Sequence, residues 1–247
     1  MSVESTMVEI AKAARRASHE IGRCSSGKKN EALLKIADKI KEDASYIKKE
    51  NSKDLDRAKE MGLSDAMIDR LTVDDSTITS MADGLMEVSQ LNDPVGSMTG
   101  SCQRPNGLQV SKMRIPLGVI AMIYESRPNV TIDAAGLCLK AGNAVILRGG
   151  SEALYSNQAL AASVNKALRE TGLPEKAVQV VPVRDRIAVN YLLKQEENID
   201  LIIPRGGEGL IRFVVENSKI PVLKHYKGVC HVYVDDGADL NMAQEIC

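Results

Sequence analysis

The spacing of apolar positions divides the chain into a helical first part and an alternating second part. Up to about residue 92 the apolar residues recur at helical intervals, most regularly between residues 29 and 50, which predicts one long amphipathic helix there. Further helices are expected over residues 8–21, 52–61 and 65–71, and from Asp74 or Asp75, as the capping residue, through Val88. Asn92-Asp93-Pro94 then interrupts the pattern.

From residue 115 onward, short apolar runs alternate with helical patterns. Residues 118–124 are almost continuously apolar, as expected of a strand buried on both faces of a parallel sheet. A helix follows, on which Ala134, Leu137, Cys138 and Ala141 form one apolar stripe, and it ends at Gly142-Asn143. Further strands are expected at residues 144–147, 178–181, 199–203, 221–223 and 231–234, with a helix at 185–194 and a last one capped by residues 235–239. Repeated strand–helix units of this length predict an α/β fold with an open, doubly wound, Rossmann-like parallel sheet.

Between these two parts the composition shifts to Gly, Ser, Gln and Asn. Pro105-Asn106-Gly107 reads as a turn between two alternating segments, which predicts a β-hairpin. Such a hairpin could pair with another subunit or cover its own chain, and the sequence leaves both open. We therefore expect a helical segment over residues 1–93, a hairpin connector over 94–113 and a cofactor domain over 114–247, with the helical segment packing on the cofactor domain.

Composition and charge exclude several classes of function. The net charge is −1, whereas a nucleic-acid partner calls for a basic surplus. No apolar run approaches the ~20 residues of a membrane span, and the first residues do not resemble a secretory signal. Five scattered cysteines without a CxxC pair indicate reduced thiols, and so a cytoplasmic protein. We expect no nucleic-acid or membrane partner.

Few residues of this sequence are candidates for metal binding or nucleophilic catalysis. The three histidines, His19, His225 and His231, do not form a ligand set, so no metal is expected. Cys230 stands next to His231 and near Lys227, and basic neighbours can lower the pKa of a thiol. An alternating strand would, however, point Cys230 and His231 to opposite faces, which favours a structural role.

Two glycine-rich turns follow strands: Arg148-Gly149-Gly150-Ser151 and Arg205-Gly206-Gly207-Glu208-Gly209. Each places free backbone N–H groups at the start of a helix, which suits an anion, although either alone could be only a tight turn. Two such turns at the same edge of one sheet favour a ligand site. The usual G-x-G-x-x-G fingerprint is absent, and the P-loop-like Gly22–Lys29 has Lys29 where that motif needs a hydroxyl. Arg148 ends the second strand, where a basic residue suits a ribose 2′-phosphate and so NADP.

Three segments carry a family resemblance. They are RIPLGVIAMIYESRPNVTIDAAGLCLKAGNAVILRGGSEA at residues 114–153, IDLIIPRGGEGLI at 199–211 and IPVLKHYKGVCHVYVDDGADLNMA at 220–243. Through them essentially the whole chain resembles the γ-glutamyl phosphate reductases (glutamate-5-semialdehyde dehydrogenases), a branch of the aldehyde dehydrogenase superfamily. The resemblance implies NADPH-dependent reduction of L-glutamyl 5-phosphate to L-glutamate 5-semialdehyde with release of phosphate, in proline biosynthesis. It also implies a cysteine thiolate that attacks the acyl phosphate.

The resemblance assigns expected roles to the loops after the strands. Arg148, with the turn Gly149, Gly150 and Ser151, matches the part that holds the cofactor ribose, and Gly206 and Gly207 match the turn under the cofactor phosphates. The loop Glu125-Ser126-Arg127-Pro128-Asn129 matches the substrate-facing loop, so Glu125, Ser126, Arg127 and Asn129 are expected to face substrate. Ser126 falls where many aldehyde dehydrogenases have an oxyanion-hole Asn.

The family's nucleophile lies in an Arg-Pro-x-x-Cys-Asn segment shortly after the helix that begins at Asp239, and the printed sequence ends before it. Neither Cys230 nor Cys247 matches that segment, so no catalytic residue is assigned here. We expect the N-terminal, cofactor-binding part of a longer enzyme, without its catalytic domain and dimerising C-terminal strand. Such a part would be inactive alone, and the whole enzyme would be a homo-oligomer. The alternatives are another acylating dehydrogenase of the same fold, such as one acting on a coenzyme A thioester, and a nucleotide-binding module without catalysis.

Overall fold

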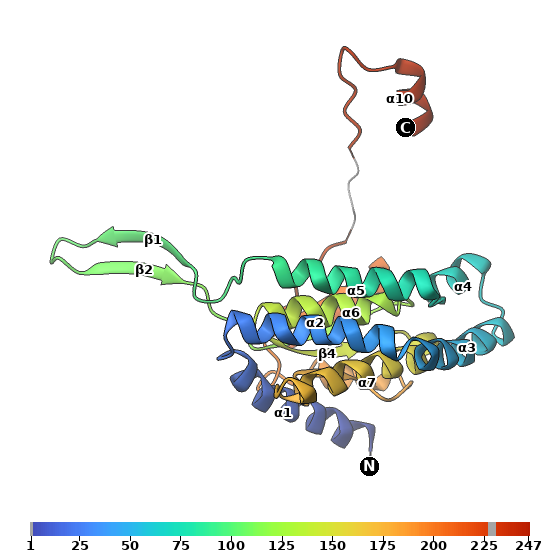
Figure 1. Cartoon of the computed structure of the whole chain (residues 1–247), viewed down its shortest axis with the longest axis horizontal. Coiled ribbons are helices and arrows are strands. Elements are labelled where there is room, and N and C mark those ends of the chain that lie inside the picture. Colours follow the sequence, from blue (N-terminus) through green and yellow to red (C-terminus); the bar gives the residue numbers. More distant parts are fainter. Residues whose placement is uncertain (1, 227–230) are drawn as a thin grey trace.

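A computed structural model of the chain describes residues 2–226 and 231–247. Five helices come first, then a β-hairpin, then an alternation of strands and helices (Figure 1). The first helices are α1 (Val3–Ile21), α2 (Ser26–Glu42), α3 (Ala44–Glu60), α4 (Asp65–Leu71) and α5 (Asp75–Gln90). The hairpin consists of β1 (Met98–Gln103) and β2 (Gln109–Met113).

Side-chain caps fix where several of these helices begin. Ser2, Ser25 and Asp74 each accept a hydrogen bond from a backbone N–H in the first turn of α1, α2 and α5. The cap by Asp74 confirms the prediction for α5. The first helix begins five residues before the expected residue 8, because the cap at Ser2 satisfies its first turn.

The prediction of one helix over residues 29–50 is wrong. Helix α2 ends at Glu42, and α3 runs from Ala44 to Glu60 across the break expected near residue 51. The turn falls at Asp43, whose carboxylate accepts hydrogen bonds from Ser163 Oγ at 2.7 Å and Lys166 Nζ at 2.9 Å, both on the later helix α7 (Leu154–Glu170). A contact between distant parts of the chain therefore sets this boundary.

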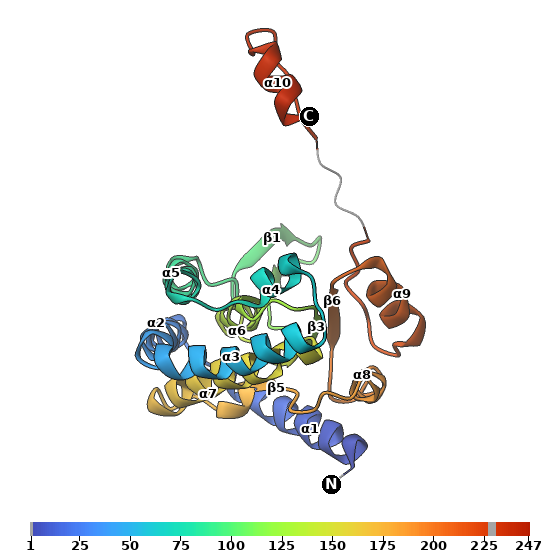
Figure 2. The ribbon, with the colours of Figure 1, turned by 90° about the vertical axis from the view of Figure 1, so that its right-hand side faces the viewer.

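The sheet is parallel, with the strand order β5–β4–β3–β6. Its strands are β3 (Val119–Tyr124), β4 (Ala144–Arg148), β5 (Val178–Val180) and β6 (Leu201–Arg205). The chain passes from β3 to β4 to β5 in one direction and then crosses to the other side of β3 (Figure 2). The order reverses between β3 and β6, which confirms the expected doubly wound sheet.

Helices cover both faces of this sheet. On one face α6 (Asn129–Lys140) and α7 (Leu154–Glu170) pack with α2, α3 and α5. On the other lie α8 (Ile187–Leu192), α9 (Glu208–Asn217) and the first part of α1. Strand residues alternate between the two cores, with Val145 and Leu147 of β4 in the first and Ala144 and Ile146 in the second. Because both faces are buried, the strands need the continuous apolar runs that predicted them.

The stripe expected on α6 is only partly correct. Ala134 is buried, but Leu137 is 53% exposed. The helix is covered on two sides, by the sheet and by α2 and α5, so its buried surface is wider than one stripe and differently centred. Gly136 lies in it so close to α5 that a Cβ there would be 2.7 Å from Leu85 Cδ2.

Two strand predictions also need correction. The strand expected at residues 199–203 is shifted, because β6 begins at Leu201 and includes Pro204. Proline is tolerated there since β6 lies at the margin of the sheet, with Ile202 bridging onward to Val222 as an isolated pair. Residues 231–234 form no strand in the described part of the chain and are exposed. The last helix, α10 (Leu240–Ile246), is capped by Asp239 as expected.

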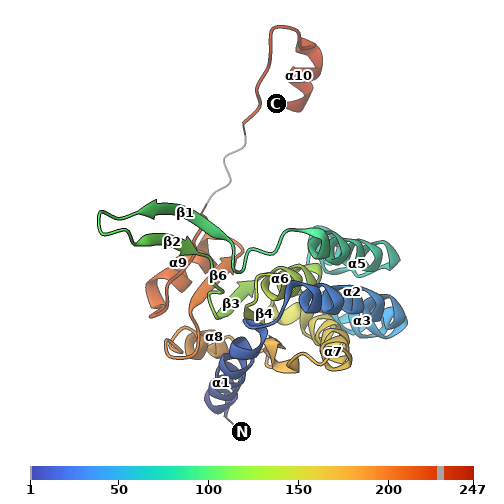
Figure 3. The same cartoon turned by 60° about the vertical axis from the view of Figure 1, so that its left-hand side comes forward.

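The hairpin forms as predicted, with Met98 opposite Met113. All residues of both strands are exposed, and the hairpin projects away from the helices and the sheet (Figure 3). In the described residues, no helix combines the length and apolar character needed to cross a membrane.

Candidate nucleotide and substrate site

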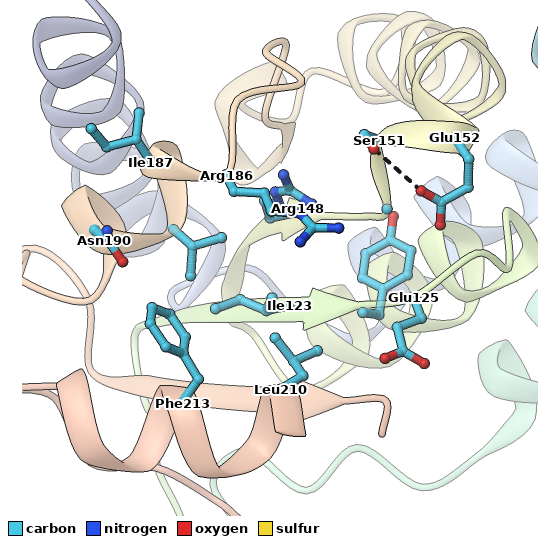
Figure 4. Close-up of a pocket in the computed structure, with 13 residues that line it drawn as sticks. Ile123, Glu125, Arg148, Ser151, Glu152, Arg186, Ile187, Asn190, Leu210 and Phe213 are labelled. Atoms are coloured by element: carbon cyan, nitrogen blue, oxygen red, sulfur yellow. Dashed lines mark hydrogen bonds between the residues drawn. The ribbon is translucent and has the colours of Figure 1, made fainter. Parts of the chain in front are cut away.

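The sheet's reversal point carries the candidate site. The loops that follow β3 and β6 both begin there, at the carboxyl edge of the sheet, where open α/β sheets bind their ligands. A cavity of about 560 Å³ opens between the loop after β3, the turn after β4, and helices α8 and α9 (Figure 4). We call it the larger cavity.

The larger cavity has an apolar wall and a polar wall. Ile187 of α8 and Leu210 and Phe213 of α9 form much of the apolar wall, while Arg148 and Arg186 lie on the polar one (Figure 4). Such a combination suits a ligand with a flat apolar ring and a charged group.

A second, smaller cavity of about 330 Å³ adjoins it. Tyr124 and Glu125 line both cavities and so form the partition between them. Met67 and Arg70 of α4 line the far side of the smaller cavity. An N-terminal helix therefore completes a site whose other residues follow the strands.

Most residues predicted to face a ligand lie at one of these cavities. Glu125, Arg148, Gly150 and Ser151 line the larger one, and Glu125, Ser126, Arg127 and Gly206 line the smaller one. Gly149 and Gly207 line neither cavity. Asn129 lines neither of them either, because it begins α6 and its Nδ2 donates to Asp133 Oδ2 at 3.3 Å.

Sequence reasoning missed the contributions of α8 and α9. Arg186, Asn190, Leu210 and Phe213 all line the larger cavity. The apolar spacing along α8 and α9 predicted two helices, but it did not predict which side of each helix would face the strand ends. Phe213, the only phenylalanine of the sequence and 40% exposed, was the signal that could have identified this wall.

The turn after β4 has no room for side chains at its glycines. A Cβ on Gly149 would lie 2.3 Å from Asn157 Nδ2. Asn157 is itself fixed, since its Oδ1 accepts a hydrogen bond from Thr131 Oγ1 at 2.9 Å, and Thr131 bonds to the hydroxyl of Tyr124 at 2.7 Å. Burial raises the pKa of Tyr124. This buried network supports the turn from below.

Arg148 connects this turn to the next loop. Its Nη1 donates to the carbonyl of Gly149 at 2.7 Å, and its Nη2 donates to the carbonyl of Arg184 at 3.2 Å. The residue is only 8% exposed, and burial lowers the pKa of Arg148, with the nearby charge of Arg186 adding to the effect. Two of its donors thus hold protein carbonyls together at the edge of the larger cavity.

Asp54 of α3 anchors the helix that follows the same turn. Its Oδ2 accepts hydrogen bonds from the backbone nitrogen of Ser156 at 2.8 Å and from Ser156 Oγ at 2.7 Å, and its Oδ1 accepts one from the backbone nitrogen of Tyr155 at 3.3 Å. Asp54 is fully buried. Burial raises the pKa of Asp54 in spite of these hydrogen bonds. The carboxylate therefore satisfies free N–H groups in the first turn of α7.

Glu125 occupies the second glycine-rich turn. Its carboxylate accepts a hydrogen bond from the backbone nitrogen of Gly207, at the start of α9. It also lies against Gly206, where an added Cβ would be 2.6 Å from the Glu125 carboxyl carbon. The neighbouring Ser126 bonds through its hydroxyl to the carboxylate of Glu152. The loop after β3 is thus attached to both glycine-rich turns.

In the described part of the chain, no cysteine lines either cavity. Cys138 of α6 is half-buried, and desolvation raises the pKa of its thiol to about 12, which makes it unreactive. Cys230, weighed above as a nucleophile, lies outside the described residues. Groups of three or more His, Cys, Asp or Glu side chains that could hold a metal are also absent from residues 2–226 and 231–247.

A doubly wound parallel sheet with adjoining cavities at its reversal point is typical of the nucleotide-binding α/β proteins. Comparison with known proteins makes the assignment specific. The sequence pattern of the aldehyde dehydrogenase family matches residues 2–247, and the chain belongs to this family.

Several relatives of this chain share one name. The chain is 68% identical over its full length to the gamma-glutamyl phosphate reductase of Desulfatibacillum aliphaticivorans and covers 59% of that protein. Crystal structures of gamma-glutamyl phosphate reductase from Thermotoga maritima and Saccharomyces cerevisiae superimpose with TM-scores of 0.90 and 0.80, at 41% and 38% identity. The superpositions cover 96% of this chain and 57% and 60% of those chains. The resemblance read from the three sequence segments is confirmed, and the chain spans about three fifths of the length of these relatives.

Proposed function

We propose that this chain forms the cofactor-binding part of a γ-glutamyl phosphate reductase, which uses NADPH to reduce L-glutamyl 5-phosphate to L-glutamate 5-semialdehyde and releases phosphate. The larger cavity at the reversal point of the sheet carries this proposal. The name shared by the relatives supports the choice of substrate.

The residues around the larger cavity fit a dinucleotide. Leu210, Phe213 and Ile187 offer an apolar surface on which a flat base can stack. The turn at Gly149 and Gly150 brings backbone close to the cavity, and the start of α9 at Gly207 offers N–H groups to a phosphate. When bound, the dihydronicotinamide supplies a hydride, while the chain's own residues bind and orient.

Two arginines can favour NADPH over NADH. Arg148, the residue expected from the sequence, uses Nη1 and Nη2 on the carbonyls of Gly149 and Arg184. Arg186 is exposed at the same cavity and forms no salt bridge with another described residue. We assign Arg186 as the cation that meets the ribose 2′-phosphate and Arg148 as the residue that positions the turn beside it.

The covalent step is not assigned to this chain, because the cavities are lined by no thiol among the described residues. Acyl transfer from an acyl phosphate requires a nucleophile within reach of the carbonyl carbon. The proposal therefore predicts that the 247-residue chain binds NADPH but does not oxidise it when the acyl phosphate is added.

The fluorescence of the reduced nicotinamide during titration with the chain tests the proposal. We expect saturable binding and a loss of about ten-fold in affinity for Phe213→Ala, because the stacking surface is removed. Tyr46→Ala, which removes an exposed aromatic ring on α3, is the matched control and should leave the affinity unchanged. Absence of saturable binding, or equal effects of the two variants, would refute the cofactor assignment. Robust NADPH oxidation would refute the proposal that this chain binds the cofactor without performing the covalent step.

A further inference from the structure

The smaller cavity brings together three arginines that lie far apart in the sequence. Arg70 belongs to α4, Arg127 to the loop after β3, and Arg205 to the end of β6. All three are exposed at the residue level. None of them forms a salt bridge with a carboxylate anywhere in the described part of the chain, unlike Arg15, Arg169 and Arg212.

The acidic side chains nearby do not neutralise this cluster. Glu125 is the one carboxylate on the lining of the smaller cavity, and it accepts the hydrogen bond from the Gly207 N–H described above. Asp69 and Asp133 line an adjoining hollow together with Arg70 and Arg127. Three guanidinium groups therefore face one carboxylate within the cavity, which leaves an excess of positive charge.

Guanidinium groups are planar, remain charged, and bind phosphate and carboxylate oxygens in pairs. A cavity of about 330 Å³ lies at the lower end of the range for ligand pockets and suits a small metabolite rather than a dinucleotide. We propose that Arg70, Arg127 and Arg205 form a binding site for an oxyanion, a phosphate or carboxylate group, of a small substrate. This inference rests on the proposed function for the identity of the substrate, an acyl phosphate, which carries both kinds of group.

The position of the site agrees with that role. Tyr124 and Glu125 separate it from the larger cavity, so an anion held by the arginines lies directly across the end of β3 from a bound cofactor. Through Arg70 the N-terminal helices take part in substrate recognition, in addition to the substrate-facing loop of residues 125–129.

Inorganic phosphate and glutarate serve as separate probes of the two oxyanion types. The 247-residue chain is titrated with each by calorimetry, with and without saturating NADPH. We expect at least one probe to bind in both conditions, and Arg70→Gln, Arg127→Gln and Arg205→Gln each to weaken it about ten-fold. Arg127→Lys keeps the charge but loses the planar guanidinium that binds oxygens in pairs. Its affinity for the probe should lie between those of wild type and Arg127→Gln. Arg104→Gln, an exposed arginine in the hairpin turn, is the matched control.

The outcomes separate this proposal from the cofactor assignment. Oxyanion binding that depends on the three arginines while NADPH fails to bind would support the site and refute only the cofactor. NADPH binding without any arginine-dependent oxyanion binding would refute only the site. Abolition of oxyanion binding by NADPH would also refute it, since the arginines would then serve the cofactor phosphates. Thermal melting shows whether each variant is folded, and the exposed positions of all three arginines predict unchanged melting temperatures.

Discussion

The Oε1 atom of Glu125 lies 3.0 Å from the backbone nitrogen of Gly207 and accepts its hydrogen bond. A side chain from the loop after β3 thereby occupies the N-terminus of α9, where the helix dipole favours negative charge. In the proposed function a cofactor phosphate would approach the same helix start, where it would compete with the Glu125 carboxylate.

Glu125→Gln should therefore strengthen NADPH binding. Glutamine keeps a carbonyl oxygen for the Gly207 N–H but removes the charge that repels a phosphate, and we expect a gain of about five-fold, or about 1 kcal/mol. The fluorescence titration measures it. Glu216→Gln, at the far end of α9, is the control and should change nothing. An unchanged or weakened affinity in Glu125→Gln would show that the carboxylate does not compete.

Arg186→Gln should change the cofactor preference, whereas Arg148→Gln should lower the stability of the fold. For Arg186→Gln we expect the preference for NADPH over NADH to fall about ten-fold with the melting temperature unchanged, because the side chain is exposed. For Arg148→Gln we expect a loss of stability of about 1–3 kcal/mol, because the carbonyls of Gly149 and Arg184 lose their donors. Paired titrations with the two cofactors and thermal melts separate these effects. Loss of NADPH preference in Arg148→Gln alone would reverse the two roles.

Asp93→Asn should destabilise the fold and alter its response to acid. Asp93 Oδ2 lies 2.6 Å from Nζ of Lys29, which is almost fully buried, and Lys140 lies close by. Burial acts to raise the pKa of Asp93, but the hydrogen bonds from Lys29 and Val95 outweigh it and leave the pKa below its ordinary value. Removing the carboxylate leaves a buried ammonium without its partner, at a cost of about 3 kcal/mol.

The lowered pKa of Asp93 fixes the direction of the pH effect. The folded state binds the proton less readily than the unfolded state, so the contribution of this carboxylate is present above about pH 4 and is lost as the pH falls through its folded-state pKa. Urea titrations over this range should show a shallower decline for Asp93→Asn than for wild type. Asp83→Asn, which removes an exposed pair with Lys41, should cost less than about 0.5 kcal/mol and leave the decline unchanged.

Gly136→Ala should destabilise the contact between α6 and α5. The new methyl would lie 2.7 Å from Leu85 Cδ2, and the resulting overpacking should cost about 1–3 kcal/mol, more than the helix propensity of alanine returns. Gly84→Ala, in α5 with nothing near its added methyl, should instead stabilise by up to about 1 kcal/mol. Chemical denaturation measures both. Leu85→Val should relieve part of the Gly136→Ala penalty, and additive effects of the two changes would contradict the proposed clash.

Much of the fold follows from local patterns in the sequence. Strands β3 and β4 are predictable because burial on both faces demands runs of apolar residues. The helix caps at Asp74 and Asp239 are predictable because each carboxylate accepts hydrogen bonds from N–H groups close by in the sequence. What the sequence could not show depends on contacts made after folding. The turn at Asp43 is fixed by α7, and the exposed side of α6 is decided by α5.

The candidate site divides in the same way. The glycine-rich turns and Arg148 were found because they stand at the ends of strands, where the topology alone brings them together. Phe213 lies on α9 and Arg186 directly precedes α8, and which side of a helix meets the cavity is a matter of packing. Met67 and Arg70 are separated from the other residues of the smaller cavity by more than fifty positions, and no motif around Arg70 indicates an anion.

The carboxylate of Asp54 gives the N-terminal helices a role in the site that distance along the chain conceals. It reaches across 102 positions to Ser156 and holds α7, which the short 3-10 turn Ser151–Ala153 joins to Gly149-Gly150. Any rearrangement of α3 therefore moves that turn with it. Sequence changes in the first sixty residues can in this way alter the candidate site, although none of those that the structure describes lines the larger cavity.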